Sequence, residues 1–375
     1  MDTFADEQLR YRIALANIKG MNRLLAETLL QQAGDVSAFF TLSPKELTDL
    51  TGWDSSLFSQ EERGRALRMA TEEVAFIRKK GITPLFFTDS DYPQRLIECD
   101  DAPIMLYYKG NNAALQAPHV VSIVGTRHAT PYGKNFVETL VRDLSDTCPD
   151  TLIVSGLAYG IDVAAHRAAL RYGLPTVAVL AHGLNTIYPA QHRNTAVDML
   201  EQGGLLTEYA SSKGMHKALF LQRNRIVAGL ADAVVVVESG VKGGSLFTAT
   251  VAGDYHRDVF ALPGRVGDIS SMGCNQLIRN NKAALITSAD DLIEAMGWAA
   301  RKATPTQAPL SVVDTADLTP DEQNIMQYLA TQGEGQINRM AIEMNTPIAT
   351  LSAMLVELEF KGCVIAFPGG VYRPV

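Results

Sequence analysis

The chain has 375 residues, of which 47% are hydrophobic and 20% charged, and its 41 acidic and 33 basic side chains give a formal net charge of −8. This charge argues against a protein that coats nucleic acid indiscriminately, because such affinity comes largely from neutralising phosphates with Lys and Arg. No apolar run reaches the ~18 residues of a membrane span, and the acidic start is unlike a secretory signal. We expect a globular cytoplasmic chain of roughly two or three domains, with no membrane partner.

Residues 1–75 carry apolar positions at helical spacing and predict a helical domain of the SAM-like kind. Within it, the stretch IKGMNRLLAETLLQQAG has the pattern of a short helix, a glycine turn and a second helix. Helix-hairpin-helix modules that touch DNA backbone share this pattern, but Met21 follows Gly20 where they favour a second glycine. We therefore favour a packing domain over a DNA contact. Residues 76–116 are expected to connect this domain to the next.

Short β-branched runs alternate with helix-length segments between residues 117 and 297. The runs are VVSIVG, TLIVSG, TVAVLAHG, LLTEY, AVVVVESG, VFALPG and ALITS. Runs that are apolar on both faces indicate a parallel sheet covered on two sides. The sequence therefore predicts a Rossmann-like, doubly wound α/β domain with a mostly parallel sheet, whose strand ends are the expected place for a ligand.

The first strand of this domain ends in a glycine loop, Gly125-Thr126-Arg127, that opens a helix. Glycine lets the backbone approach a ligand closely, and amides at a helix start favour anions. Arg127 is then a candidate bidentate phosphate ligand. A salt bridge from Arg127 to a neighbouring carboxylate is an equally good interpretation of this residue by itself.

The second strand ends in SGLAYGID, which repeats the glycine pattern and places Ser155, Gly156 and Tyr159 at the same edge of the sheet. Asp162 and His166 follow, one helical turn apart, and could imitate an acid and base pair. We favour a structural role for both, because an aspartate in a first turn is stabilised by the helix dipole and can hold a nearby polar group.

The stretch KALFLQRNR is the densest basic cluster of the domain. Lys217, Arg223 and Arg225 could neutralise a phosphate backbone, with Asn224 beside them, and Phe220 offers a ring on which a base can stack. Burial of Phe220 in the core is the alternative.

The loop ESGVKGGSLFT follows a later strand and enters a helix rich in Ala and Thr. Its backbone amides and hydroxyls, including those of Gly244 and Ser245, suit a phosphate or a ribose.

The C-terminal part begins with residues 298–317, which contain two prolines and no periodicity and are expected to form a linker. From residue 318 to 375, TPDE opens a helix, two amphipathic segments follow, and VIAFPGGVYRPV indicates a hairpin. This order predicts a winged helix. Its six acidic and three basic residues disfavour phosphate, so we expect a protein-contact or regulatory module.

The four cysteines lie far apart, with no CxxC pair and no histidine at zinc-ligand spacing. They are Cys99, Cys148, Cys274 and Cys363. We expect reduced, buried thiols, and neither a metal nor a cofactor.

Several of these stretches, taken together, resemble the DNA processing protein A (DprA/Smf) family of bacteria in their order and spacing. They are SIVGTR, SGLAYGID, YPAQHRN, FLQRNRIVAGLADAVVVVESGVKGGSLFTA, ALPG and GCNQLI, and they span about residues 121–288. The resemblance implies a non-catalytic homodimer that binds incoming single-stranded DNA during natural transformation. It also implies partners: the RecA recombinase, which the protein helps to load, and single-strand binding protein, which it displaces or cooperates with.

The resemblance also implies site residues. DNA contact would fall on Arg127, Lys217, Phe220, Arg223 and Arg225, in a pocket lined by Gly125, Ser155, Gly156, Gly244 and Ser245. Leu277 and Ile278 would lie near the dimer interface. Tyr159 departs from the family, whose members frequently have a basic residue there, although a tyrosine could stack on a base instead.

Two other functions compete with this hypothesis. Nucleotide phosphoribohydrolases of the lysine-decarboxylase-like group share the sheet and a PGGxGTxxE loop, but here Gly243-Gly244 is followed by SLFTAT, without the glutamate that assists departure of the base. A transcriptional regulator would read duplex DNA through the winged helix, which the acidic charge of that module disfavours.

Overall fold

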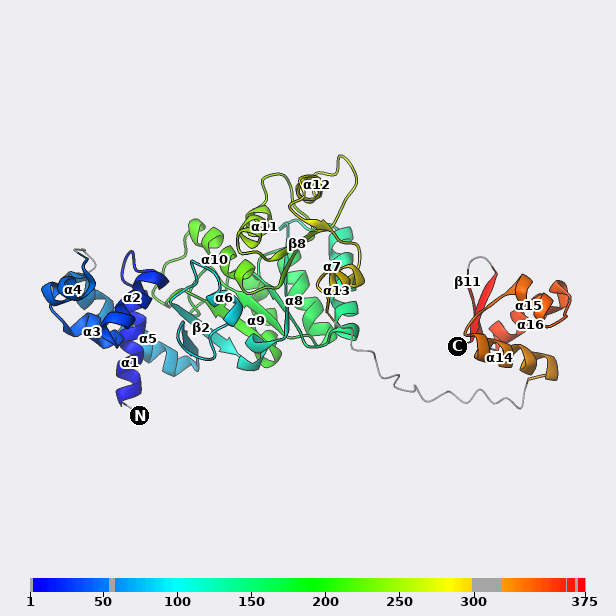
Figure 1. Cartoon of the computed structure of the whole chain (residues 1–375), viewed down its shortest axis with the longest axis horizontal. Coiled ribbons are helices and arrows are strands. Elements are labelled where there is room, and N and C mark those ends of the chain that lie inside the picture. The colour runs from blue at the N-terminus through cyan, green and yellow to red at the C-terminus, as the bar shows by residue number, and fades with distance from the viewer. Residues whose placement is uncertain (1–2, 54–57, 299–317, 362, 368–369, 375) are drawn as a thin grey trace. The chain divides into compact units, whose positions relative to one another are not determined.

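The computed structural model describes residues 3–53, 58–298, 318–361, 363–367 and 370–374 (Figure 1). The chain divides into two compact units, Met1–Arg301 and Lys302–Val375. Apart from Trp298, the expected linker over 298–317 lies outside the described residues.

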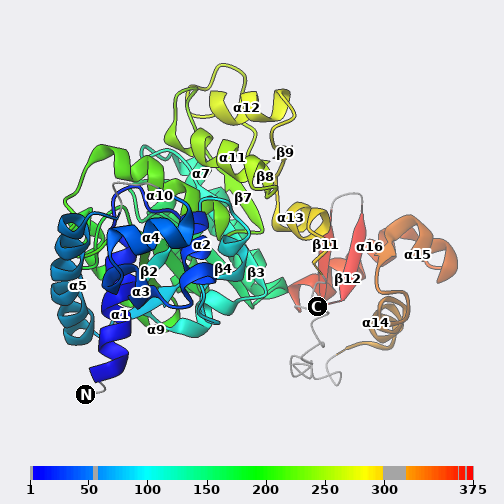
Figure 2. The ribbon, with the colours of Figure 1, turned by 60° about the vertical axis from the view of Figure 1, so that its left-hand side comes forward.

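The described residues of the N-terminal part of the first unit form five α-helices. They are α1 (Thr3–Ala16), α2 (Arg23–Ala33), α3 (Val36–Thr41), α4 (Pro44–Thr51) and α5 (Gln60–Lys80). Gly20 has a φ of 86° in the turn between α1 and α2, and Ser43 and Glu46 form a capping box at the start of α4. The helices gather beside β2 (Met105–Gly110) (Figures 1 and 2), so the predicted helical region packs against the edge of the sheet.

The sheet has nine strands in the order β1-β2-β6-β5-β4-β3-β7-β8-β9. The other strands are β1 (Thr83–Phe86), β3 (His119–Val124), β4 (Thr151–Ser155), β5 (Thr176–Val179), β6 (Gly204–Thr207), β7 (Ala233–Val236), β8 (Asp258–Ala261) and β9 (Ala284–Leu285). Strands β3 to β9 pair in parallel, and β2 pairs antiparallel with β1 and β6. The seven predicted runs are β3 to β9, and the Rossmann-like, mostly parallel sheet is confirmed.

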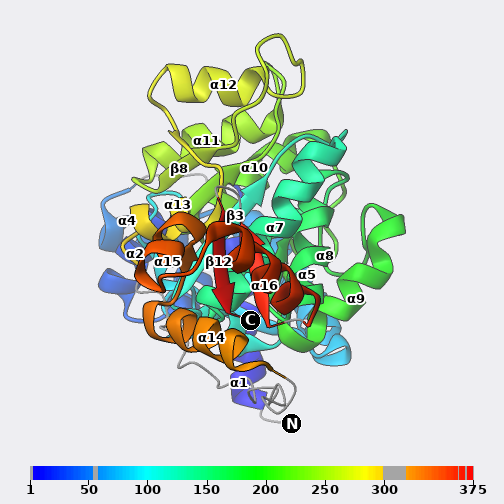
Figure 3. The ribbon, with the colours of Figure 1, turned by 90° about the vertical axis from the view of Figure 1, so that its right-hand side faces the viewer.

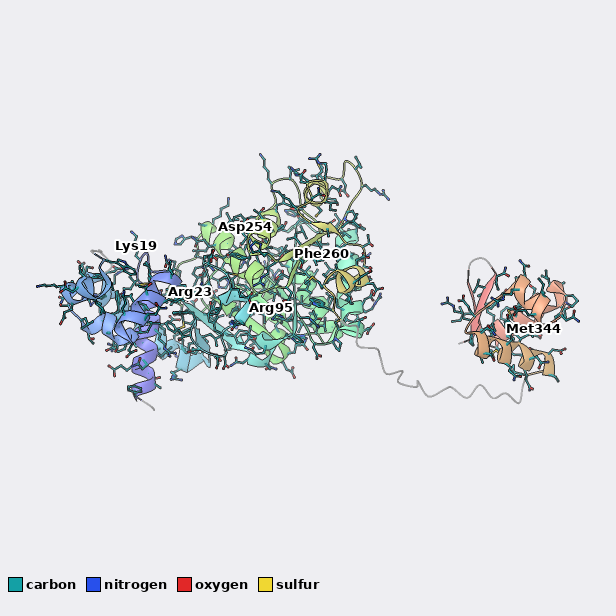
Figure 4. The ribbon with its side chains drawn as sticks, viewed as in Figure 1. Lys19, Arg23, Arg95, Asp254, Phe260 and Met344 are labelled. Carbon is teal, nitrogen blue, oxygen red and sulfur yellow. The ribbon has the colours of Figure 1, made fainter. Side chains whose placement is uncertain are left out.

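Residues 76–116 do more than connect, because they supply β1 and β2 to the edge of this sheet. Tyr107 and Tyr108 of β2 are buried. Arg95, labelled in Figure 4, ties this segment to the parallel strands: its Nε donates to Asp232 Oδ1 at 2.5 Å and its Nη2 to the Pro118 carbonyl at 2.7 Å. An antiparallel edge on a parallel sheet is common. Strand β2 was not predicted because it is buried on both faces, so its sequence lacks the alternation of apolar and polar residues that reveals an antiparallel strand.

Helices cover both faces of the sheet, as a doubly wound fold requires. One face packs against α7 (Pro131–Thr147), α8 (Ile161–Tyr172), α9 (Arg193–Gln202) and α13 (Ala289–Ala295). The other packs against α6 (Gln94–Ile97), α10 (Lys217–Gly229), α11 (Gly244–Asp254) and α12 (Met272–Arg279). Short 3₁₀ helices also occur at Asn112–Gln116 and Ala190–His192. Along β3, Val121 and Ile123 face the first set of helices, and Val120 and Val124 face the second.

The second unit has the predicted winged-helix order (Figure 3). Its elements are α14 (Pro320–Gln332), β10 (Gly335–Gln336), α15 (Ile337–Glu343), α16 (Ile348–Phe360), β11 (Val364–Phe367) and β12 (Val371–Pro374). Thr319 and Glu322 form a capping box with Pro320 in the first turn of α14, as TPDE predicts. The predicted hairpin is the antiparallel pair β11 and β12.

All four cysteines are buried and unpaired. Within the described ranges, no helix is both long and apolar enough to cross a bilayer.

Candidate nucleic-acid interface

The point where the strand order reverses lies between β3 and β7. The chain runs from β3 to β6 on one side of β3 and then returns to build β7, β8 and β9 on the other. Loops leave these two strands in opposite directions, and open α/β sheets bind ligands in the crevice that results. A cavity of about 340 Å³ lies there. Its lining comes from the loops after β3, β4 and β7, from α10 and from α11, and consists of Val124, Gly125, Thr126, Arg127, His128, Ala158, Asp162, Phe220, Leu221, Arg223, Asn224, Ser239, Gly240, Gly243, Gly244, Ser245 and Thr248.

A buried carboxylate holds the loops after β3 and β7 together. The Glu238 side chain accepts hydrogen bonds from Thr130 N at 2.9 Å and Thr130 Oγ1 at 2.5 Å, and its carbonyl accepts from Thr126 N at 2.7 Å. The start of α7, where we expected an external anion, is therefore already occupied by Glu238. That expectation was wrong because a loop more than a hundred residues later supplies the carboxylate.

The start of α11 is different. Gly243 precedes the helix and provides no side-chain cap, and Gly244 and Ser245 of the first turn line the cavity. The Ser245 hydroxyl donates to Ser239 Oγ at 2.9 Å. The first amides of a helix have no acceptor within it and attract anions. The cavity thus has a helix start suited to a phosphate group.

The loop after β4 packs directly on the loop after β3. Gly160 has a φ of 79°, and a Cβ there would lie 2.2 Å from the Thr126 carbonyl oxygen, so only glycine fits. The Asp162 carboxylate accepts from the amides of Gly156 at 3.2 Å and Ala158 at 3.4 Å. Asp162 therefore shapes its own loop, which agrees with the structural role predicted for it.

Arg127 and Phe220 meet at the rim of the cavity. Arg127 is exposed, and its guanidinium carbon lies 5.9 Å from the centroid of the Phe220 ring. Across the described parts of the chain, no ion pair forms with Arg127, so the salt-bridge interpretation fails. Phe220 is half-buried and meets the Tyr188 ring edge-on at 5.8 Å. It lies in the lining of the cavity and not in the interior of the core.

Arg223 is a structural cation, contrary to the expectation that it contacts phosphate. It is 5% exposed, and its Nη1 donates to the carbonyl oxygens of Val179 and, at 2.8 Å, of Gly156. A Cβ on Gly156 would lie 2.3 Å from that Nη1, so this glycine makes room for the arginine and not for a ligand. Burial lowers the pKa of Arg223, and nearby Asp162 opposes this effect.

Other predicted residues lie outside the cavity. Ser155 is fully buried and donates to the Ile123 carbonyl at 2.6 Å. Arg225 forms ion pairs with Glu208 and, at 3.5 Å, with Asp101. The sequence shows these side chains but not their partners, so the expectations for Ser155 and Arg225 were wrong.

Lys217 and Tyr159 lie next to the cavity. Lys217 is exposed in the first turn of α10, on the helix face shared by Phe220, Leu221 and Asn224 at spacings of three, four and seven. Tyr159 is 41% exposed, and its hydroxyl donates to Gln191 Oε1 at 2.8 Å. Of the thirteen residues expected to bind DNA, eight line one cavity: Gly125, Thr126, Arg127, Phe220, Arg223, Asn224, Gly244 and Ser245.

Comparison with known proteins shows the family to which this chain belongs. Residues 83–297 match the family model described as DNA recombination-mediator protein A, and residues 307–370 match that of the DprA winged helix domain. The chain belongs to the DNA recombination-mediator protein A (DprA/Smf) family. It is 33% identical over 331 residues to protein Smf of Escherichia coli K12, covering 84% of this chain and 86% of that protein.

Two solved structures of DNA processing protein A also resemble this chain. That of Streptococcus pneumoniae has a TM-score of 0.62 at 32% identity, covering 76% of this chain and 95% of its own. That of Helicobacter pylori, a protein described with a single-stranded DNA binding mode, has a TM-score of 0.52 at 32% identity, covering 57% of this chain and 95% of its own. The family is one of recombination mediators and not of enzymes.

Some cavity residues of this DprA family member were missed from the sequence. Leu221 is 49% exposed and lines the cavity beside Phe220, and His128 and Ser239 line it as well. The spacing of four between Lys217 and Leu221 was the available signal, since it places both on one helix face.

Leu277 is 6% exposed and packs in the main core, so its side chain offers little surface to a partner. Ile278 is half-buried against the same core. The expectation that Leu277 and Ile278 lie near a dimer interface stays a prediction; within α12, Cys274 and Leu277 turn toward the core, whereas Met272 is exposed. Nearby apolar side chains that are exposed are Val266, Ile269 and Met272.

The acid stability of this DprA family member should depend on His166, which is fully buried and bonded through Nδ1 to Thr176 Oγ1 at 2.7 Å. Burial, with Arg223 and His192 nearby, lowers the pKa of His166 from 6.5 to about 3. Below pH 6.5 the unfolded chain therefore binds a proton that the native protein does not, and native stability falls from there toward pH 3. In His166→Asn, the free energy of unfolding in urea should fall less steeply with decreasing pH, by up to ~1.4 kcal/mol per pH unit. Equal slopes for both proteins would contradict this.

Proposed function

We propose that this protein binds single-stranded DNA in the cavity between the loops after β3 and β7, without altering the strand chemically. One observation carries the proposal: the uncapped start of α11, the unpaired Arg127 guanidinium and the Phe220 ring, all within the described residues, converge on a single cavity. A single-strand site needs cations for the backbone and rings for the bases.

The proposed binding mode assigns each group a part. A phosphate binds at the first turn of α11, beside the Ser245 hydroxyl, and Arg127 binds the same phosphate or the next one. A base stacks on Phe220 against Leu221, and Lys217 binds the backbone one turn farther out. None of these contacts reads a base edge, so binding should tolerate any sequence.

The proposed setting is natural transformation in the cytoplasm. There a homodimer would hold incoming single-stranded DNA, displace or cooperate with single-strand binding protein, and help to load the RecA recombinase. Support for these partners comes from membership in the DprA/Smf family, and the single-stranded DNA binding mode described for the Helicobacter pylori protein supports the single strand as ligand.

The direct test is fluorescence anisotropy of a labelled oligo-dT strand, followed by competition with unlabelled single-stranded and duplex DNA. The single strand should compete better than duplex at moderate salt. A winged-helix regulator requires the opposite, and duplex as the better competitor would overturn the proposal.

Incubation with nucleoside monophosphates tests the competing hydrolase function and should release no free base. Hydrolysis needs a carboxylate that assists departure of the base, and the Asp162 carboxylate in the lining is already held by two backbone amides.

Replacing Phe220 tests the stacking part of this mode. Phe220→Ala should weaken oligo-dT binding by roughly 5- to 150-fold, since base stacking on an aromatic side chain contributes about 1–3 kcal/mol per base. Phe220→Trp should retain binding. Phe247, an exposed ring on α11 outside the cavity, provides the control, and Phe247→Ala should bind as the unmodified protein does. Equal losses in both alanine variants would count against a specific stack.

A further inference from the structure

A second groove adjoins the cavity, on the side of α7 and α8. It has a volume of about 510 Å³ and shares Arg127 and His128 with the first. The two helices lie side by side along it (Figures 1 and 3). Its remaining lining consists of Ala129, Lys134, Glu138, Tyr159, Gly160, Val163, Ala164, Arg167 and Arg171. The shared pair places the two hollows next to each other at Arg127.

The charge of this α7–α8 groove is positive in a chain whose total is negative. Four cations, Arg127, Lys134, Arg167 and Arg171, face one carboxylate, Glu138. Arg171 is paired with Glu138, whereas Arg167 has one hydrogen bond, to Thr195 Oγ1 at 3.3 Å. Lys134 and Arg167 are exposed and form no ion pair within the described residues. Two cations besides Arg127 therefore remain available to an external anion.

An aromatic ring lies in the same groove. Tyr159 meets the buried His192 ring edge-on at 4.9 Å, and its hydroxyl is held by Gln191. These two contacts fix the ring from one side and leave its exposed part toward the groove. A fixed ring beside unpaired cations is the combination that single-strand sites use for backbone and base.

We propose that the DNA strand that leaves the first cavity past Arg127 continues along the α7–α8 groove, where Lys134 and Arg167 bind phosphates and Tyr159 stacks on a base. This inference rests on the proposed function. It extends the site by Lys134 of α7, Arg167 of α8 and Tyr159 of the loop after β4. It predicts an affinity that grows with strand length beyond what the first cavity can hold.

The test compares a short oligo-dT of about 4 nucleotides with one of about 15 nucleotides, lengths that bracket common single-strand site sizes. The double variant Lys134→Ala/Arg167→Ala should bind the long strand about 25-fold more weakly near 0.1 M salt. Each phosphate contact to a single strand raises the affinity about fivefold when the salt is lowered from 1 M to 0.1 M, and the variant loses two such contacts. The slope of log K against log salt should become shallower by about 1.4. Binding of the short strand should not change.

Arg142, on α7 outside both hollows and paired with Asp143, is the matched control, and Arg142→Ala should bind both strands normally. If the double variant does not fold, Lys134→Ala and Tyr159→Ala are measured separately, each with a loss on the long strand alone. Unchanged long-strand affinity, or equal losses on both strands, overturns the inference. If at the same time Arg127→Ala weakens both strands, the proposed function stands without the extension. Failure of the unmodified protein to bind either strand overturns both.

Discussion

Arg127→Ala is expected to weaken the binding of oligo-dT by roughly 10- to 150-fold, because a hydrogen bond to a charged group contributes about 1.5–3 kcal/mol. Arg127 belongs to both hollows and forms no ion pair in the described part of the chain, so its whole charge is available to DNA. Its position over the Phe220 ring also orients the base-stacking surface. The loss should be the same for every sequence, and the salt slope should become shallower by about 0.7.

The control for this prediction is Arg279, an exposed arginine of α12 outside both hollows, whose replacement by alanine should leave the affinity unchanged. Arg127→Lys should recover part of the binding, because lysine keeps the charge but loses the bidentate geometry. The melting temperature of Arg127→Ala should match that of the unmodified protein. Unaltered oligo-dT affinity in Arg127→Ala would remove the central residue of the proposed site.

The fold could be predicted because a parallel sheet buried on both faces produces continuous apolar runs, and these runs are unmistakable in β3, β4 and β7. The glycine loops could be predicted as well, because they directly follow these apolar runs. The segment before β3 escaped, since β2 is antiparallel and equally buried, and its partner β6 lies almost a hundred residues later.

The roles of the cations could not be predicted from the sequence. Lys217, Arg223 and Arg225 lie within nine residues of α10, yet one is exposed, one is buried beneath the cavity and one is paired. The 3.6-residue period of the helix makes these three side chains point in different directions, but the groups that each one contacts decide its role. Glu208 and Asp162 come from other strand ends, so only the folded chain shows which cation remains free.

Arg223→Met should destabilise the protein by about 2–6 kcal/mol, because it leaves two buried carbonyl acceptors without their donor, at a cost of about 1–3 kcal/mol each. Methionine has a similar length but leaves the carbonyl groups of Gly156 and Val179 without their donor and the buried Asp162 without its neighbouring cation. Burial already raises the pKa of Asp162, with Arg223 opposing the rise, so the charged carboxylate becomes still harder to keep once the arginine is gone. Chemical denaturation measures the loss, and Arg279→Met controls for the substitution itself.

The double variant Asp162→Asn/Arg223→Met should recover part of this stability, because it removes the buried carboxylate that the single variant leaves without a neighbouring cation. The two arginines of the cavity are then distinguished by opposite signatures. Arg127→Ala loses DNA at constant stability, whereas Arg223→Met loses stability first, and loses DNA because the loop at Gly156 no longer holds the floor of the cavity. If Arg223→Met melted like the unmodified protein and still lost oligo-dT, Arg223 would be a DNA ligand after all, and its hydrogen bonds to Gly156 and Val179 would have to break when the strand binds.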